Sequence, residues 1–298
     1  MKIATAFCIL VTGAVASAQT YKLRQVGAPY SPDFRAYFEQ NGTVISPFHD
    51  IPLKAGKDVY NMVVEIPRWT NAKFEINKET ELNPIIQDQK NGTVRFVCNL
   101  FPYNGYLWNY GAFPQTWEDP NYVTQETHTK GDNDPIDVIE IGDELATMGQ
   151  VKQVKILGIL GLLDQGETDW KVIVIDTKDK MASKMKDIED VKKYKPGLLE
   201  ATNTWFTYYK VPTGDKKNKL AFNGESKNRE YATRTVEETH EFWKALVNGT
   251  TKAPIKTINM SQKGTPGYKQ KVDIPEANLQ AALPLNDTVK GWSYVDTD

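Results

Sequence analysis

The chain has 298 residues, of which 40% are hydrophobic and 11% aromatic, and this is enough to bury a core of ordinary density. Its 36 basic and 38 acidic residues are mixed along the sequence and give a net charge of −2, so no overall field attracts nucleic acid or an anionic membrane. The composition therefore excludes a disordered tail and a protein that binds polyanions through bulk positive charge.

Residues 1–18 predict a secretory signal peptide. An apolar run over residues 3–15 follows Lys2, and Ala16-Ser17-Ala18 forms a small-residue cleavage site before Gln19. The run is too short to span a bilayer, and residues 1–18 contain no arginine, which argues against a mitochondrial transit peptide. The alternative is an uncleaved N-terminal strand that is buried in the fold.

Five Asn-X-Ser/Thr sequons support entry into the secretory pathway. They are at Asn41, Asn91, Asn248, Asn259 and Asn286. We therefore expect the protein in the secretory pathway or outside the cell, with glycans at the two Asn-Gly sequons of the β-rich region pointing into solvent.

Short strands joined by tight turns are predicted between residues 40 and 180, because apolar or alternating runs there are bounded by Asn, Gly and Pro. Asn41-Gly42 and Asn91-Gly92 are typical of two-residue hairpin turns. A third hairpin is expected where the run 156–163 gives way to Gln165-Gly166 and continues as residues 171–175. The middle of the chain is thus predicted to be rich in β-structure.

Two helices are predicted after these strands. The first begins at Pro196, a good first-turn residue, and is ended by Pro212. The second has apolar residues at helical spacing over residues 232–246 and stops at Gly249. From residue 250 to residue 298 the periodicity is weak, so we expect an extended tail laid over the surface.

The clearest chemical feature is the segment 131–137, GDNDPID, which contains Asp132, Asp134 and Asp137. If this segment is a strand, Asp132 and Asp134 face the same way and converge on one point. Clustered carboxylates repel one another unless cations hold them, and oxygen ligands favour Mg²⁺, Mn²⁺ or Ca²⁺ over zinc. A solvated acidic turn explains the cluster equally well. An EF-hand loop is excluded, because Ile136 and Asp137 stand where it needs an oxygen ligand and a glycine.

Further charged residues alternate with apolar ones on predicted strands. Asp169 and Lys171 share one strand face, as do Lys73 and Glu75, although either strand alone more often presents a half-solvated surface than a site. Arginine and lysine beside carboxylates, such as Arg95, suit a phosphoryl ligand. The sequence contains no HExxH, GxGxxG, GxxxxGK[ST] or GxSxG motif, which argues against zinc, dinucleotide, P-loop and hydrolase-elbow chemistry.

With these motifs in view, the chain resembles the family I soluble inorganic pyrophosphatases of the fungal and animal type. The similarity runs in order over about residues 21–250 and is carried by these segments: FHDIP (48–52), VVEIPRWTNAK (63–73), NPIIQD (83–88), NYGAFPQTWEDP (109–120), GDNDPID (131–137), GETDWK (166–171) and PGLL (196–199). The resemblance implies an α+β, mainly β fold with an oligonucleotide-binding-like five-stranded β-barrel core and flanking hairpins and helices. It also implies a pyrophosphatase domain at 19–250, after the signal at 1–18, and a C-terminal extension at 251–298 packed on the same domain.

The resemblance assigns roles to individual residues. Asp134 is the expected general base, with Tyr106 as a further catalytic group. The expected metal ligands are Asp132, Asp137, Asp169, Asp164 and Glu75. The expected substrate-binding groups are Lys73, Arg95, Tyr110, Tyr209 and Lys210. Supporting positions are Glu65, Glu167 and Lys171.

The implied reaction is metal-dependent hydrolysis of inorganic pyrophosphate to two phosphates by direct attack of a metal-activated water. The implied cofactor is Mg²⁺, several ions per active site, with Mn²⁺ or other divalent ions as possible substitutes. The implied partners are pyrophosphate and a second copy of the chain in a homodimer, with neither nucleic acid nor membrane. Arg68 and Trp69 are candidates for the dimer contact, while Tyr103 and Asn104 stand where relatives carry histidines near it.

Three alternatives remain open from the sequence. One is a non-enzymatic oligonucleotide-binding barrel, which predicts a basic groove with stacking aromatic residues. Another is a secreted calcium-binding or glycosylated protein that has kept the fold and lost the activity. The last is a phosphohydrolase for nucleotides or polyphosphate. The signal peptide sets the chain apart from the common family members, which act in the cytoplasm or in organelles.

Overall fold

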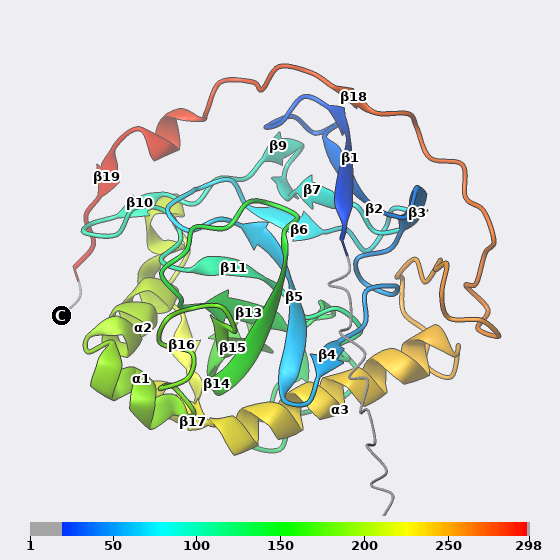
Figure 1. Ribbon diagram of the computed structural model, residues 1–298. Coiled ribbons are helices and arrows are strands. Elements are labelled where there is room, and N and C mark those ends of the chain that lie inside the picture. Colours follow the sequence, from blue (N-terminus) through cyan, green and yellow to red (C-terminus); the bar gives the residue numbers. More distant parts are fainter. Residues whose placement is uncertain (1–19, 297–298) are drawn as a thin grey trace, which may run out of the picture.

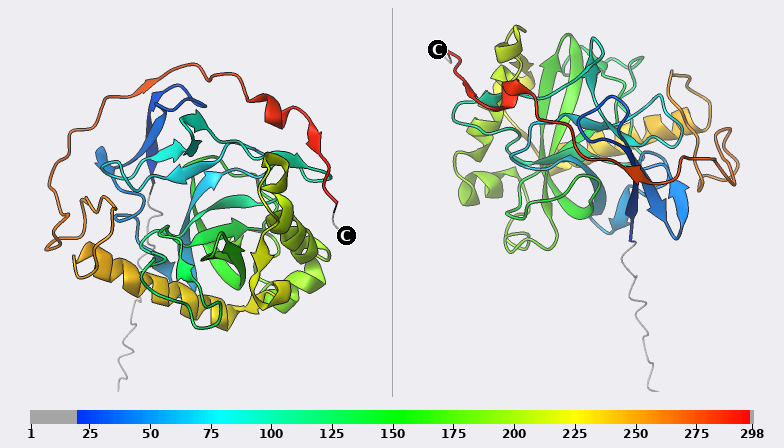
Figure 2. Two further views of the ribbon diagram at one scale, coloured as in Figure 1. Left: turned by 180° about the vertical axis from the view of Figure 1, so that it is seen from behind. Right: turned by 90° about the horizontal axis from the view of Figure 1, so that it is seen from above.

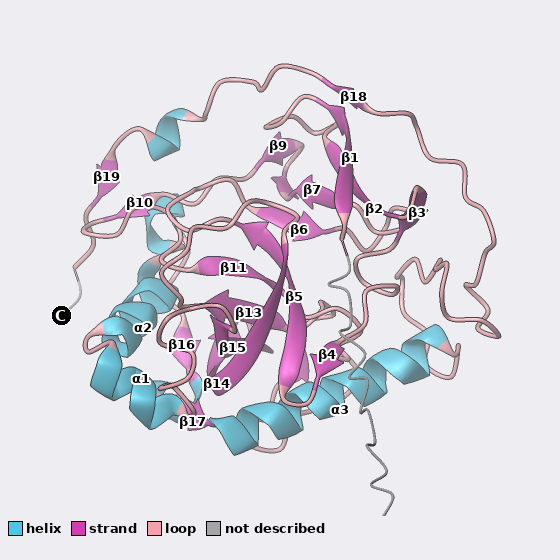
Figure 3. Ribbon diagram, in the orientation of Figure 1, coloured by secondary structure: helices cyan, strands magenta, loops and turns pink. Residues whose placement is uncertain are grey.

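The computed structural model describes residues 20–296, so the predicted signal peptide and its alternative, a buried strand, lie outside the described residues. Strands occupy the centre of the molecule, and the helices α1 (Ile188–Tyr194), α2 (Leu198–Tyr208) and α3 (Arg229–Val247) lie around them (Figures 1 and 3). The expectation of an α+β, mainly β fold is confirmed.

Five strands close into a hydrogen-bonded ring. β5 (Val59–Ile66) pairs antiparallel with both β11 (Asn109–Ala112) and β14 (Val151–Asp164). β13 (Asp137–Glu140) pairs with β11 and runs parallel to β15 (Glu167–Asp176). Antiparallel pairing between β14 and β15 completes the circuit. This ring agrees with the expected oligonucleotide-binding-like core.

The β14–β15 hairpin confirms the third predicted turn. Gln165 and Gly166 join the two strands and both have positive φ angles, 51° and 93°, as two-residue hairpin loops require. Because alternate residues of a strand face the same side, Asp169 and Lys171 project together from β15. The turn therefore fixes the register that carries two predicted site residues.

The two Asn-Gly turns are confirmed as well. β2 (Arg35–Gln40) returns through Asn41-Gly42 into β3 (Thr43–Ile45), and β8 (Gln89–Lys90) returns through Asn91-Gly92 into β9 (Thr93–Val94). β2 also belongs to a second, six-stranded sheet. The strand order of that sheet is β18 (Asn278–Leu279), β1 (Lys22–Gly27), β2, β7 (Ile85–Gln87) and β6 (Phe74–Ile76), and β3 is its sixth strand through its pairing with β2.

The remaining strands are short. They are β4 (Lys54–Gly56), β10 (Asn99–Leu100), β12 (Lys130–Gly131), β16 (Lys219–Leu220), β17 (Lys227–Asn228) and β19 (Trp292–Ser293). Three short 3₁₀ helices are η1 (Val211–Thr213), η2 (Ala221–Gly224) and η3 (Asp287–Val289).

Helix boundaries differ in part from the prediction. α2 begins at Leu198 rather than at Pro196, because Gly197 adopts a left-handed conformation, with φ of 84°, at the N-cap. α3 spans the predicted second helix and is followed by Gly249, with φ of 75°. α1 was not predicted, since it has only 7 residues, too few to show a helical period. None of the helices in residues 20–296 is long and apolar enough to cross a membrane.

Aromatic packing seats α2 against the ring. Trp108, which precedes β11, stacks on Phe206 with a centroid separation of 5.0 Å. Trp205 is 1% exposed, and its indole N–H donates to the Gly105 carbonyl over 2.9 Å. It also stacks on Tyr209 at 4.6 Å. The end of α2 is therefore held in a fixed position over the strands.

The predicted extended tail is confirmed over the described residues. After α3 the chain runs as an arc around the outside of the molecule, over β1 and on to β10 (Figures 1 and 2). β18 runs parallel to β1, and β19 runs parallel to β10. The tail therefore contacts the second sheet at β1 and a separate strand at β10. The proposed domain limits at residues 250 and 251 stay a prediction.

Candidate active site

A cavity of about 200 Å³ opens beside the acidic segment 131–137 and the end of α2. All but two of the predicted site residues line it: Lys73, Arg95, Tyr106, Tyr110, Asp132, Asp134, Asp137, Asp164, Glu167, Asp169, Lys171, Tyr209 and Lys210. The exceptions are Glu75, which pairs with the lining residue Lys73, and Glu65, which accepts a hydrogen bond from β6. Trp205 and Phe206 also line it, which the sequence did not predict.

The segment 131–137 reaches the cavity as a turn. A Cβ atom on Gly131 would lie 2.5 Å from the backbone carbon of Glu118, so only glycine allows this close approach. Asn133 has a φ of 70°, and the Asp134 N–H donates to Asp132 Oδ1 over 3.0 Å. The prediction that Asp132 and Asp134 converge along a strand is therefore wrong in its geometry, although both residues line the cavity.

A cluster of carboxylates lies at this end of the cavity. One oxygen each of Glu118, Asp132 and Asp169 lie within 4.8 Å of one another. Burial raises the pKa of Asp169 to about 7, and burial followed by the charge of Asp134 raises the pKa of Asp132 well above its usual value. An all-oxygen donor set of this kind fits a hard divalent cation, which would favour the ionised carboxylates.

Lys171 joins two predicted metal ligands. Its ammonium group forms ion pairs with Asp137 and Asp169 and donates to the Tyr110 hydroxyl over 3.1 Å. The Tyr110 hydroxyl in turn donates to Asp137 over 2.5 Å. Burial lowers the pKa of Lys171, but the charges of Asp137 and Asp169 outweigh this and raise it well above its usual value. The lysine is therefore a fixed positive charge at the cavity wall.

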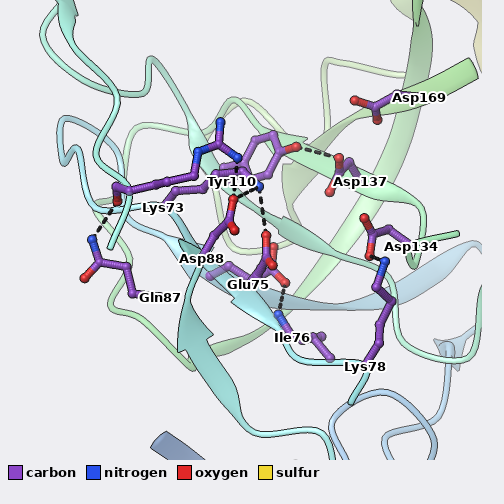
Figure 4. Close-up of polar contacts among 12 residues, drawn as sticks. Lys73, Glu75, Ile76, Lys78, Gln87, Asp88, Tyr110, Asp134, Asp137 and Asp169 are labelled. Atoms are coloured by element: carbon purple, nitrogen blue, oxygen red, sulfur yellow. Dashed lines mark hydrogen bonds and ion pairs between the residues drawn. The ribbon is translucent and has the colours of Figure 1, made fainter. Parts of the chain in front are cut away.

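A second group of charges faces the acidic turn. Lys73 forms ion pairs with Glu75 over 2.8 Å and with Asp88 over 2.9 Å, and Arg95 also pairs with Asp88. Figure 4 shows Lys73, Glu75 and Asp88 on one side and Asp134, Asp137 and Asp169 on the other. Glu65 is 4% exposed, and its Oε1 accepts from the Ile76 N–H over 2.7 Å, which holds β6 in place.

The end of α2 supplies further predicted site residues. Lys210 forms an ion pair with Asp164 at the end of β14. Tyr209 stacks on Trp205, and the Tyr106 ring lies 4.9 Å from Trp205 and 5.1 Å from Tyr110. Burial raises the pKa values of both Tyr106 and Tyr209, so their hydroxyl groups stay protonated as hydrogen-bond donors.

Three charged residues beside the cavity were also missed from the sequence. Lys78 pairs with Asp134 over 2.6 Å, as Figure 4 shows. Asp88 stands at the end of a motif that was quoted without a role for it, and it anchors Lys73 and Arg95. Glu118, in the motif 109–120, lies with Asp132 and Asp169. Asp88 and Glu118 both belong to segments that carry the family resemblance, but only the folded structure shows which residues they contact.

Residues 62–244 match the family model described as "Pyrophosphatase: Inorganic pyrophosphatase". The chain belongs to the inorganic pyrophosphatase family. The matched range contains every predicted site residue of this pyrophosphatase-family chain, from Glu65 to Lys210.

Relatives cover nearly the whole chain. The inorganic pyrophosphatase of Debaryomyces hansenii is 53% identical over 282 residues, which are 93% of this chain and 98% of that protein. The inorganic pyrophosphatase of Schizosaccharomyces pombe is 54% identical over 281 residues, covering 92% of this chain and 97% of that protein. The match therefore extends over almost the full length of both relatives.

Solved structures agree with the fold. The inorganic pyrophosphatase of Schistosoma japonicum superposes with a TM-score of 0.88 at 45% identity and covers 93% of this chain and 100% of that one. A truncated vacuolar soluble pyrophosphatase of Trypanosoma cruzi, solved in complex with PPi, gives a TM-score of 0.71 at 41% identity. It covers 82% of this chain and 97% of that one.

Proposed function

We propose that this protein hydrolyses inorganic pyrophosphate to two phosphates in a metal-dependent reaction. The observation that carries the proposal is a single cavity in which clustered carboxylates face lysine and arginine side chains. Carboxylates alone repel a polyanion, whereas carboxylates that hold cations beside fixed positive charges bind one. The related Trypanosoma cruzi structure in complex with PPi supports this choice of ligand.

The carboxylates of the cavity would hold the metal ions, and Mg²⁺ suits their all-oxygen character. The residues proposed as ligands are Asp132, Asp137, Asp164, Asp169 and Glu75. When bound, divalent ions supply a water of lowered pKa and offset the negative charge of the phosphates. Mn²⁺ has similar ligand preferences and is the proposed substitute.

Asp134 is proposed to accept the proton of the attacking water. It lines the cavity, its side chain is 43% exposed, and its Oδ1 lies 2.6 Å from Lys78 Nζ. A carboxylate within reach of the water can take its proton as the bond to phosphorus forms. The ion pair with the ammonium group of Lys78 holds the Asp134 side chain in position.

The cationic and phenolic groups are proposed to bind the two phosphates. They are Lys73, Arg95, Tyr110, Tyr209 and Lys210. In the structure each of the three cations is paired with a carboxylate, so phosphate oxygens would exchange with partners already at ion-pair distance. Arginine offers a bidentate contact and lysine a point charge, and both stabilise charge that passes to the leaving phosphate.

The same arrangement argues against a nucleic-acid-binding barrel, because carboxylates rather than a basic groove surround the cavity. The proposal is tested by measuring phosphate release from pyrophosphate with Mg²⁺, with EDTA, and with ATP as a competing substrate. Metal-dependent release that ATP does not suppress is expected. Equal turnover of ATP would instead indicate a broader phosphohydrolase.

We propose a homodimer whose contact includes exposed aromatic residues: Trp69, and a cluster formed by Phe101, Trp292 and Tyr294. Trp69 is 56% exposed, Phe101 55%, Trp292 46% and Tyr294 75%. The Phe101 ring lies 5.8 Å from that of Trp292 and 5.3 Å from that of Tyr294. Exposed aromatic groups in contact with one another are typical of protein interfaces. The C-terminal tail supplies two of the four residues, so it would contribute to the contact.

We also propose that the protein enters the secretory pathway. Asn41, Asn91 and Asn248 are exposed and accessible to glycosylation. Asn259 is fully buried, and its amide donates to Thr257 and Thr265, so this sequon does not accept a glycan in the folded protein. N-terminal sequencing of the native protein tests the proposal: a start at Gln19 is expected, and a start at Met1 would contradict cleavage.

A further inference from the structure

Glu118 is a buried carboxylate to which the proposed reaction assigns no role. The residue is 3% exposed and lies in the connection between β11 and β12. Its Oε2 is buried and has no hydrogen-bond partner among residues 20–296. Because an unpaired carboxylate oxygen is costly to bury, its position points to a ligand that it would contact.

Hydrogen bonds fix Glu118 at the junction of two segments that carry proposed metal ligands. Its backbone N–H donates to the Asp134 carbonyl, and its carbonyl accepts from the Asn133 N–H, both over 2.9 Å. Its Oε1 accepts from the Trp170 N–H over 3.1 Å. Trp170 follows Asp169 on β15, so Glu118 ties the acidic turn to that strand at the metal-binding end of the cavity.

The distances suit a divalent cation. One carboxylate oxygen each of Glu118, Asp132 and Asp169 lie within 4.8 Å of one another. An ion with metal–oxygen distances of about 2.0–2.6 Å fits among oxygens at this separation. The three residues come from three different parts of the chain, and the hydrogen bonds of Glu118 hold them together before any ion binds.

We propose that Glu118 is a further carboxylate of the metal site and presents its unpartnered oxygen to the ion that Asp132 and Asp169 hold. This inference rests on the proposed metal-dependent function. It extends the metal site beyond the acidic turn and the β14–β15 hairpin to the connection before β12. Removal of the negative charge at residue 118 should therefore weaken metal binding even where no substrate is present.

The test is isothermal titration of the full chain with Mn²⁺ alone, without pyrophosphate. Glu118→Gln keeps the shape and the Oε1 acceptor while it removes the charge. Glu238→Gln is the matched control, because Glu238 is an exposed glutamate of α3 that lines, together with Glu118, a second cavity of about 20 Å³. We expect Glu118→Gln to weaken the tightest Mn²⁺ site by about 10- to 100-fold and Glu238→Gln to leave it unchanged.

Asp132→Asn separates this inference from the proposed function. Weakened binding in Asp132→Asn together with wild-type affinity in Glu118→Gln would overturn the role of Glu118 alone. Absence of Mn²⁺ binding by the wild-type protein would overturn the metal-dependent function as well. If circular dichroism shows that Glu118→Gln does not fold, Glu118→Asp withdraws the carboxylate by one methylene group. Reduced Mn²⁺ affinity is then expected, and wild-type affinity in that variant would contradict the proposal.

Discussion

Asp134 lines the cavity, and its side chain pairs with Lys78 over 2.6 Å. Asp134→Asn keeps the shape of the side chain but removes its capacity to accept a proton. We expect kcat for pyrophosphate hydrolysis to fall about 100-fold or more, since general base catalysis contributes rate factors of that size. Circular dichroism should show an unchanged fold.

Asp119→Asn is the control for this experiment. Asp119 does not line the cavity, and its Oδ1 accepts a hydrogen bond from the Asn121 N–H. The control should keep wild-type turnover. Turnover near the wild-type rate in Asp134→Asn would remove Asp134 from the role of general base.

The sequence predicts single residues of the site best where they fall within contiguous motifs. Asp132, Asp134 and Asp137 lie close together in one segment, and this spacing by itself indicated a possible metal site. Lys78 could not be found in this way, because its partner Asp134 is 56 positions away and the contact exists only in the folded chain. The role of Glu118 was missed for the same reason, because the backbone hydrogen bonds that position it join it to Asn133 and Asp134 and exist only in the folded chain.

Among the elements, α2 depends most clearly on one side chain. Trp205 is 1% exposed, contacts Tyr106, Trp108 and Tyr209, and donates to the Gly105 carbonyl. Trp205→Ala should lower the free energy of unfolding by about 3–5 kcal/mol, because it leaves a large cavity in the packed interface. Urea denaturation measures this change.

The partly exposed Thr204 of the same helix provides a comparison, and Thr204→Ala should change the free energy of unfolding by about 0.5 kcal/mol or less. A loss below about 1 kcal/mol in Trp205→Ala would show that α2 is held by other contacts. Trp205 also stacks on Tyr209, which is proposed to bind phosphate, so Trp205→Ala should bind phosphate more weakly as well.

Elements with a strong local signal were predicted correctly. The three hairpins were marked by Asn-Gly or Gln-Gly turns, whose residues adopt the positive φ angles that such turns require. The convergence of Asp132 and Asp134 was argued for the case in which the acidic segment is a strand, but the left-handed conformation at Asn133 and the contact of Gly131 with Glu118 make the segment a turn. α1 depends on a capping box between Asp187 and Asp190 rather than on a long apolar stripe.

On the scale of the whole molecule, His49 links the core to α3 and to the tail. Its Nδ1 accepts from the Trp243 indole N–H over 3.0 Å, so the imidazole is neutral and its Nε2–H donates to the Lys256 carbonyl over 3.0 Å. Burial lowers the pKa of His49 to about 4. Its folded-state pKa is therefore below the unfolded value of about 6.5.

The contribution of neutral, buried His49 to the free energy of unfolding is complete above about pH 6.5. It is lost as the pH falls toward about 4, because the unfolded chain takes up the proton first. Between pH 7 and pH 4.5, the wild-type protein should lose about 2–3 kcal/mol more of its free energy of unfolding than His49→Gln does. Urea denaturation at both pH values measures the difference. Equal losses in the two proteins would show that His49 does not carry this pH dependence.

The proposed dimer predicts a change in mass. Light scattering of the wild-type protein at micromolar concentration should give about twice the mass of the chain, because its exposed aromatic cluster would be covered by a second copy. The double variant Phe101→Ser with Trp292→Ser should be monomeric. Leu145→Ser is the control, since Leu145 is 53% exposed and belongs to no such cluster. A monomeric wild-type protein would contradict the proposal.

The course of the whole chain was predicted less completely than its motifs. Weak periodicity after residue 250 indicated an extended tail, but only the structure shows that β18 pairs with β1 and β19 with β10. Those pairings join residues that are more than 150 positions apart, and no local pattern encodes them. Closure of the five-stranded ring likewise followed from the family resemblance and not from composition.

The carboxylate-lined cavity is the proposed metal-dependent pyrophosphatase site of this chain. The most direct measurement is phosphate release from pyrophosphate by the purified protein while Mg²⁺ is added, removed with excess EDTA and restored. We predict turnover of about 1–10³ s⁻¹ with Mg²⁺, its loss in EDTA and its return with the metal. No release with Mg²⁺, or release that EDTA does not suppress, would contradict the claim.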